Sequence, residues 1–149
     1  MRPNSSLVRR SAAACLSVAV LGGAAWAAET PPGPLEQDGW TLITASEQTL
    51  VYMKPAPSPD RALKRAWTAY DSAIKRDRSG FTFMSVQALG EFDCRRKSAR
   101  VLDETFHDGR ALQGRSWKMP GFVPTPWAPV APDSVGAVRL AFVCMGDEV

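Results

Sequence analysis

The sequence predicts an α+β domain, an antiparallel β-sheet of five or six strands with one C-terminal helix packed on it. Short runs rich in β-branched and aromatic residues succeed one another between residues 40 and 117, and turn-forming residues separate them. A stretch with helical character follows only at residues 132–144. Strands followed by a single helix favour a sheet with the helix laid across one face.

The first 27 residues predict an export signal that is cleaved after Ala27. A basic start at residues 2–10 leads into an apolar run at residues 11–25, and the triplet Ala25-Trp26-Ala27 has the small residues of a cleavage site. A transmembrane helix needs about 20 apolar residues, and this run is shorter, so we expect no integral membrane anchor. The mature protein is therefore expected outside the cytoplasm.

Cleavage would also change the charge balance. The signal takes away three of the 18 bases and none of the 15 acids, which leaves 15 of each in a mature chain of 122 residues. The pI of about 9.0 then belongs to the leader. Nucleic-acid binding, which needs a basic footprint, is not expected. The mature length suits a single domain.

The N-terminal half of the mature chain predicts a lead-in followed by three strands. Residues 28–38 are rich in proline and charge and predict a flexible lead-in to a domain at residues 39–149. The runs at 40–44 and 49–53 predict a hairpin. Alternation favours a strand at 62–71, although its alanine, leucine and lysine would also suit a helix. Residues 72–80 are polar, end in glycine and predict a mobile connection.

The next segment predicts further strands and one tight turn. Residues 81–94 form a long strand candidate with a bulge or bend at Gly90. Residues 98–106 and 111–117 predict two strands joined by the turn 107–110, where Asp108-Gly109 would supply the positive φ angles of a tight hairpin.

The C-terminal segment predicts a surface stretch and then the helix. Five prolines between Met119 and Pro132 exclude a central strand or a helix there. Asp133 or Ser134 is the expected N-cap of the final helix, which should end near Gly146. Four side chains are expected near one helical face: Val135, Val138, Leu140 and Phe142.

Catalytic and metal-binding groups are scarce. His107 is the only histidine, and no nucleophile motif accompanies it, so we expect a solvated turn histidine and no catalytic residue. With Asp103, Glu104 and Asp108 it would offer a metal ion one nitrogen ligand, so neither a metal site nor a cofactor is expected. An alternative function, a periplasmic enzyme or enzyme inhibitor, would use the loops around His107 and Trp117.

The four mature tryptophans predict two different roles. Trp40 and Trp67 lie within strand patterns and are expected in the core. Trp117 and Trp127 flank the proline-rich stretch, where each could either fix that stretch to the sheet or stand out as an anchor for a partner.

A cluster of bases follows Cys94. If the chain continues as a strand, Arg96, Ser98 and Arg100 would share one face. The cluster is either a solvated outer face or a patch that meets acidic groups on a protein partner or an anionic lipid. Together with Trp117 and Trp127, the candidate partner-binding residues are Arg95, Arg96, Lys97 and Arg100.

Two cysteines remain after the signal is removed, because Cys15 leaves with it. Two cysteines in an exported chain are most simply a disulfide pair, so Cys94 and Cys144 are expected to be bonded.

Several motifs in order resemble the surface-adhesin protein E family of Gram-negative bacteria. They are an early tryptophan strand, "EFDCRR" continuing into "SARVL", a tryptophan before "APDSVG", and a closing "FVC". The similarity extends from Trp40 to Cys144. It implies a small exported domain of antiparallel strands and a C-terminal helix, in which Cys94 and Cys144 join helix to sheet.

The resemblance also implies a function and a location. It implies a non-enzymatic, adhesin-like domain in the periplasm or on the cell surface of a Gram-negative bacterium. Members named as adhesins bind host extracellular-matrix and serum proteins and dimerise. A protein partner of that kind, or an envelope component, is therefore expected, as is a homodimer.

Overall fold

The structure, a computed structural model, describes residues 33–145. The predicted export signal at residues 1–27 lies outside the described residues and stays a prediction. The described elements are helix α1 (Pro34–Gln37), strands β1 (Thr41–Ala45), β2 (Thr49–Ala56), β3 (Lys64–Arg78), β4 (Phe81–Asp93), β5 (Ser98–His107), β6 (Ser116–Trp117) and β7 (Ala128–Pro129), and helix α2 (Val135–Cys144).

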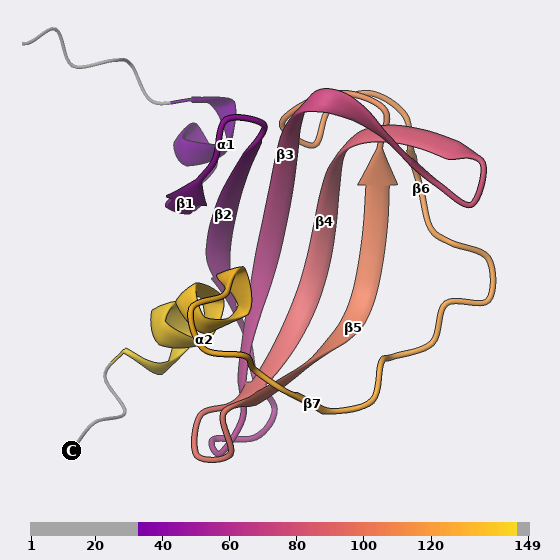
Figure 1. The fold of residues 1–149 in the computed structure, drawn as a ribbon. Coiled ribbons are helices and arrows are strands. Elements are labelled where there is room, and N and C mark those ends of the chain that lie inside the picture. The colour runs from indigo at the N-terminus through magenta and orange to yellow at the C-terminus, as the bar shows by residue number, and fades with distance from the viewer. Residues whose placement is uncertain (1–32, 146–149) are drawn as a thin grey trace, which may run out of the picture. The chain divides into compact units, whose positions relative to one another are not determined.

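All strand pairs form one antiparallel sheet in the order β1-β2-β3-β4-β5-β6, with β7 paired to the other end of β5. Helix α2 packs against β1, β2 and β3, and Figure 1 shows it across that part of the sheet. The predicted α+β class, antiparallel sheet and C-terminal helix are confirmed. Long β3 and β4 form the centre, whereas β6 and β7 contain two residues each.

Apolar side chains pack on both faces of the sheet, because successive side chains of a strand point to opposite sides. On the helix side, Met53 and Phe92 are buried against Leu140 and Phe142 of α2. On the opposite side, Tyr52 packs with three other buried residues, Leu35, Trp40 and Ala69. The prediction of Trp40 in the core is confirmed, and Trp67 packs half-buried against this second cluster.

Helix α1 corrects the predicted lead-in at residues 28–38. Leu35 is only 4% exposed and packs with Trp40, whose amide donates to the Leu35 carbonyl at 3.1 Å. Residues 33–38 therefore belong to the folded domain, because this single apolar side chain enters the second cluster. Residues 28–32 lie outside the described part of the chain.

The predicted mobile connection at residues 72–80 is also wrong. Strand β3 continues to Arg78 and pairs with the beginning of β4, after a shift of register between Asp71 and Arg76. A turn with positive φ at Ser79 and Gly80 closes the hairpin. Residues 73–78 are exposed. This part of β3 therefore lacks the alternation of apolar and polar residues by which a half-buried strand is recognised in a sequence.

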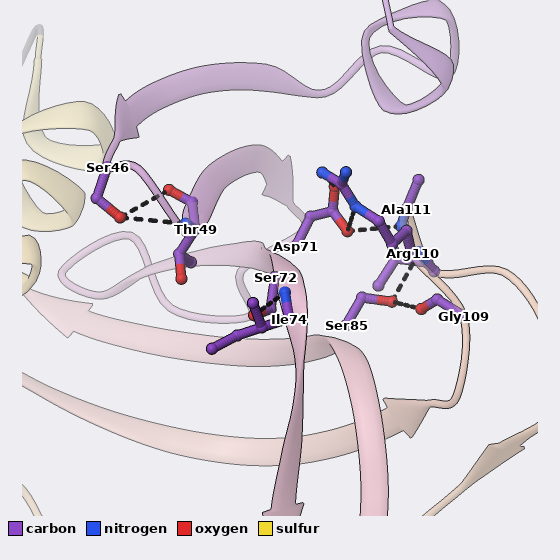
Figure 2. A network of polar contacts seen from close by, with 10 residues as sticks. Ser46, Thr49, Asp71, Ser72, Ile74, Ser85, Gly109, Arg110 and Ala111 are labelled. Atoms are coloured by element: carbon purple, nitrogen blue, oxygen red, sulfur yellow. Dashed lines mark hydrogen bonds and ion pairs between the residues drawn. The ribbon is translucent and has the colours of Figure 1, made fainter.

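The hairpin between β5 and β6 exists, but its turn is wider than the tight turn predicted at Asp108-Gly109. Positive φ angles occur instead at Ala111, Leu112 and Gly114. Figure 2 shows why this turn, here called the anchored loop (residues 108–115), extends over the sheet. The Asp71 carboxylate accepts bonds from Arg110 Nη2 at 2.8 Å and from the Ala111 amide at 2.9 Å.

Ser85 holds the same loop from the neighbouring strand. Its hydroxyl donates to the Gly109 carbonyl at 2.6 Å and accepts from the Leu112 amide at 2.9 Å. Two buried polar side chains of the sheet thus satisfy backbone groups of the anchored loop, which places Ala111 and Leu112 against the second cluster.

Helix α2 begins where the sequence predicts. Ser134 is the N-cap, and its hydroxyl accepts from the Ala137 amide at 3.2 Å. The predicted helical face is half right, because Leu140 and Phe142 pack on the sheet while Val135 and Val138 are 43% and 39% exposed. The helix ends at Cys144, with Met145 as the C-cap, and the predicted stop at Gly146 lies outside the described residues.

Gly90 allows the close approach of α2. The register of β4 against β5 shifts between Leu89 and Gly90, as the predicted bulge requires. A Cβ at this position would lie 2.8 Å from Phe92 Cε2 and 2.9 Å from Arg139 Nη2. Arg139 in turn donates from Nε to Thr68 Oγ1 at 3.1 Å, so the glycine leaves room for a helix-to-sheet contact.

The proline-rich stretch runs along the outer edge of β5, as Figure 1 shows. Besides the β7 pairing, the Thr125 amide donates to the Val101 carbonyl at 2.9 Å, and the Val101 amide donates to Thr125 Oγ1 at 2.8 Å. The surface position predicted for residues 119–132 is confirmed, and the stretch binds the β5 edge at Ser98, Ala99 and Val101.

Candidate functional site

Cys94 and Cys144 form a disulfide, with their Cα atoms 5.8 Å apart. The predicted pair is confirmed. Cys94 directly follows β4 and Cys144 is the last residue of α2, so the bond joins the end of the helix to the sheet. Cys94 is therefore a structural residue and no free thiol nucleophile.

Three adjacent bases, Arg95, Arg96 and Lys97, make up the turn between β4 and β5, and all three are exposed. We call them the basic turn. The prediction that Arg96 shares a strand face with Ser98 and Arg100 is wrong, because the chain turns here and Lys97 adopts a positive φ of 50°. Arg96 contacts Asp93 at 3.8 Å, whereas Arg95 and Lys97 make no ion pair within residues 33–145.

Arg100 is held within the sheet and is not part of the basic turn. Arg65, Glu91 and Arg100 lie directly opposite one another on β3, β4 and β5. Glu91 is 2% exposed, and its carboxylate accepts from Arg65 Nε at 2.8 Å and from Arg100 Nε at 2.8 Å. Burial would raise the pKa of Glu91, but the hydrogen bonds from Arg100 and Arg65 outweigh it and lower the pKa.

The two candidate tryptophans differ in their surroundings. Trp127 is 39% exposed, and the Arg100 guanidinium lies 4.8 Å from its ring centre. Trp117 packs against Phe81 and Phe106, and its Nε1 is buried without a hydrogen-bond partner among the described residues. Trp117 therefore fixes the strand that leads into the proline-rich stretch, and Trp127 both covers Arg100 and reaches solvent.

His107 is not the solvated turn residue that the sequence predicts. It ends β5, and both ring nitrogens are buried without a hydrogen-bond partner among residues 33–145. This burial lowers the pKa of His107, and the neighbouring Asp108 carboxylate opposes the shift. Nothing in the described part of the chain hydrogen-bonds the imidazole to a nucleophile or an acid.

The acids considered as metal ligands beside His107 are engaged elsewhere. Asp103 contacts Lys118, Glu104 contacts Arg78, and Asp108 contacts Arg115. Hydrogen bonds from Arg115 lower the pKa of Asp108. Within residues 33–145, no group of three or more histidines, cysteines or acids is arranged to hold a metal ion.

A groove of about 800 Å³ lies beside the disulfide. The apolar part of its lining, here called the floor, comprises Ala137, Leu140 and Ala141 of α2 and the two cysteines, and residues 130–133 also line it. Arg95 and Lys97 of the basic turn line it as well, and with Arg61, from the loop between β2 and β3, they are here called the basic rim. Sequence reasoning missed Arg61, because no local pattern shows that its loop meets the basic turn.

Comparisons with known proteins agree with this architecture. The profile of the family described as surface-adhesin protein E matches residues 40–145. No curated protein matches the sequence. Among residues 33–145, no helix has the length and apolar character needed to span a membrane.

Solved structures of Haemophilus influenzae protein E are similar in fold. Crystal form II has 9% identity and a TM-score of 0.54, and the match covers 69% of this chain and 91% of that one. A second structure has 11% identity and a TM-score of 0.55, with coverage of 72% and 84%. Protein E from the non-typeable bacterium has 10% identity, a TM-score of 0.55, and coverage of 72% and 76%.

Proposed function

Because this chain belongs to the surface-adhesin protein E family, we propose that it is an exported, non-enzymatic binding domain whose basic turn recognises an acidic surface on a partner protein. The partner belongs to the class of host matrix proteins, serum proteins or components of the bacterial envelope. The protein acts in the periplasm or on the cell surface of a Gram-negative bacterium.

This proposal rests on the exposure of the basic turn and on its few ion pairs. Arg95, Arg96 and Lys97 project from the end of the sheet, and two of them make no ion pair with any described residue. The neighbouring Arg65 and Arg100 are instead bound by Glu91. Exposed bases that form no ion pair attract an acidic partner and raise the rate of its association.

The surroundings of His107 favour binding over catalysis. A general base needs hydrogen-bond reach to the proton that it removes. Both His107 nitrogens are buried, and the imidazole has no described partner to activate. The alternative of an enzyme that uses His107 therefore gains no support from these contacts.

Surface plasmon resonance on the mature protein tests the proposal. Immobilised matrix proteins, serum proteins and envelope extracts would form the panel. The double variant Arg95→Gln/Lys97→Gln should weaken each specific interaction about tenfold, since it removes two exposed ion pairs of less than about 1 kcal/mol each. The control Lys75→Gln/Arg76→Gln removes the same charge from the exposed hairpin of β3 and β4 and should change little.

Two results would contradict the proposal. One is the absence of any interaction above background across the panel. The other is an equal loss of affinity in the control and in the basic-turn variant, which would show that affinity depends on the net charge of the protein and not on the basic turn. The homodimer implied by the family is a separate prediction, and sedimentation equilibrium of the mature protein measures it directly.

A further inference from the structure

We propose that the groove beside the disulfide receives an acidic segment of the partner protein, with an apolar side chain on the groove floor and carboxylates at its basic rim. This inference rests on the proposed function and specifies the chemistry of the partner. It places recognition in a defined cavity between α2, the basic turn and the loop that carries Arg61.

The floor of the groove is apolar and rigid. Its lining includes Leu140 and Ala141 of α2, the two cysteines of the disulfide, and Val130, Ala131 and Pro132. Helix α2 is fixed at its start by the Ser134 cap and at its end by the disulfide. A volume of about 800 Å³ is within the range of about 300–1,000 Å³ typical of ligand pockets and exceeds what one side chain needs.

The rim of the groove is basic. Arg61, Arg95 and Lys97 are exposed and make no ion pair within residues 33–145. Among residues 33–145, the lining contains one acid, Asp133, so three positive charges face one negative charge there. The net charge of the lining therefore matches two carboxylates.

This charge balance favours a peptide segment over a fatty acid. The bases come from two separate loops, one between β2 and β3 and the other between β4 and β5, so the charge is divided between two parts of the rim. A fatty acid carries one carboxylate, which cannot neutralise both parts. An acidic segment with two carboxylates on either side of an apolar residue can contact both loops while its apolar side chain covers the floor.

Fluorescence anisotropy with a defined probe tests the inference. The probe is a short labelled peptide in which two glutamates flank a leucine-phenylalanine pair, and the comparison peptide has glutamine in place of both glutamates. The first peptide should bind the mature protein saturably and the second at least about tenfold more weakly. Raising the salt from about 0.05 M to about 0.5 M should weaken the first peptide by screening the rim charges.

Two helix variants separate the groove from the rest of the surface. Ala141→Phe would fill the groove from an exposed position of α2 and should abolish saturable binding of the peptide. Val138→Phe places the same phenyl ring at an exposed position of the same helix outside the groove lining and should leave binding unchanged. Arg61→Gln should weaken the peptide severalfold, whereas Lys75→Gln should not.

Three outcomes would overturn the inference. The first is equal affinity of the protein for both peptides. The second is undiminished binding of the glutamate peptide to the Ala141→Phe variant. The third is binding of phosphatidylglycerol vesicles or laurate by a protein that does not bind the glutamate peptide. The proposed function is tested separately. If Ala141→Phe leaves affinity for a panel protein unchanged while Arg95→Gln/Lys97→Gln lowers it, the groove inference fails and the basic turn still binds the partner.

Discussion

Removal of the disulfide should destabilise the domain by about 4 kcal/mol. The bond joins cysteines 50 positions apart. Closing a loop of that length lowers the entropy of the unfolded chain by about 14 cal/mol/K, which is about 4 kcal/mol at 25 °C. A domain of this size has about 5–15 kcal/mol of stability in total, so the loss is a large part of it. The perturbation is the double variant Cys94→Ala/Cys144→Ala.

Urea unfolding followed by tryptophan fluorescence measures this loss. With a denaturant slope of about 2 kcal/mol per molar, the midpoint should fall by about 2 M. Reductant should lower the midpoint of the natural sequence by a similar amount and should not affect the double variant. A loss below about 1 kcal/mol, or a midpoint that ignores reductant, would refute the reasoning that the bond acts by restricting the unfolded chain.

Three further predictions concern Glu91, His107 and Ser134. Glu91→Gln should cost about 2 kcal/mol, because Arg65 and Arg100 lose a charged acceptor. The lowered pKa of Glu91 means that its contribution is complete above the ordinary pKa of 4.5 and disappears as the pH falls through the folded-state pKa. Urea midpoints should therefore fall more steeply below pH 4.5 in the natural sequence than in the variant, and parallel profiles would contradict this account. The pKa of His107 is lowered by burial, so the unfolded state takes up the proton first, and stability should decline as the pH falls below 6.5. His107→Gln should remove that decline in thermal melts, and an unchanged decline would assign it to another group. Ser134→Ala should cost about 1 kcal/mol by removing the cap of α2, while Ser134→Thr should keep most of the stability, and equal losses in the two would argue against capping.

The helix cap, the β-bulge and the disulfide of this domain can be predicted from the sequence, because each depends on neighbouring residues or on residue counts. Ser134 is recognisable as a cap because its hydroxyl bonds an amide three residues away. Gly90 is recognisable as a bulge because a glycine interrupts a strand rich in aromatic and β-branched residues. The pairing of Cys94 with Cys144 needs only the count of cysteines left after export.

The structure differs from the sequence prediction where contacts between residues distant in sequence determine the conformation. Asp108-Gly109 has the residues of a tight turn, but Asp71 and Ser85 bind the loop and shift its positive φ angles to later residues. Residues 72–80 show no strand pattern because β3 is solvated from residue 73 onward. Val135 and Val138 lie outside the contact with the sheet, and a short amphipathic pattern does not show which part of the helix meets it.

In the candidate site, too, some residues can be predicted from the sequence and others are revealed only by the fold. The basic turn is visible in the sequence as adjacent bases after Cys94, whereas Arg61 joins it only through the fold. Arg100 resembles its basic neighbours in sequence, but strand register places it opposite Glu91, whose carboxylate pairs with its guanidinium.

The covering of β5 by the proline-rich stretch limits how such sheets can associate. A sheet with two open edges can add strands from other molecules on both sides, and the assembly has no natural end. Here β6 engages one end of the β5 edge and Thr125 and β7 engage the other, while β1 ends the sheet on the other side with no described strand beyond it. Association through β1 alone uses the same edge of both molecules, so it closes after two copies and cannot propagate into a fibre.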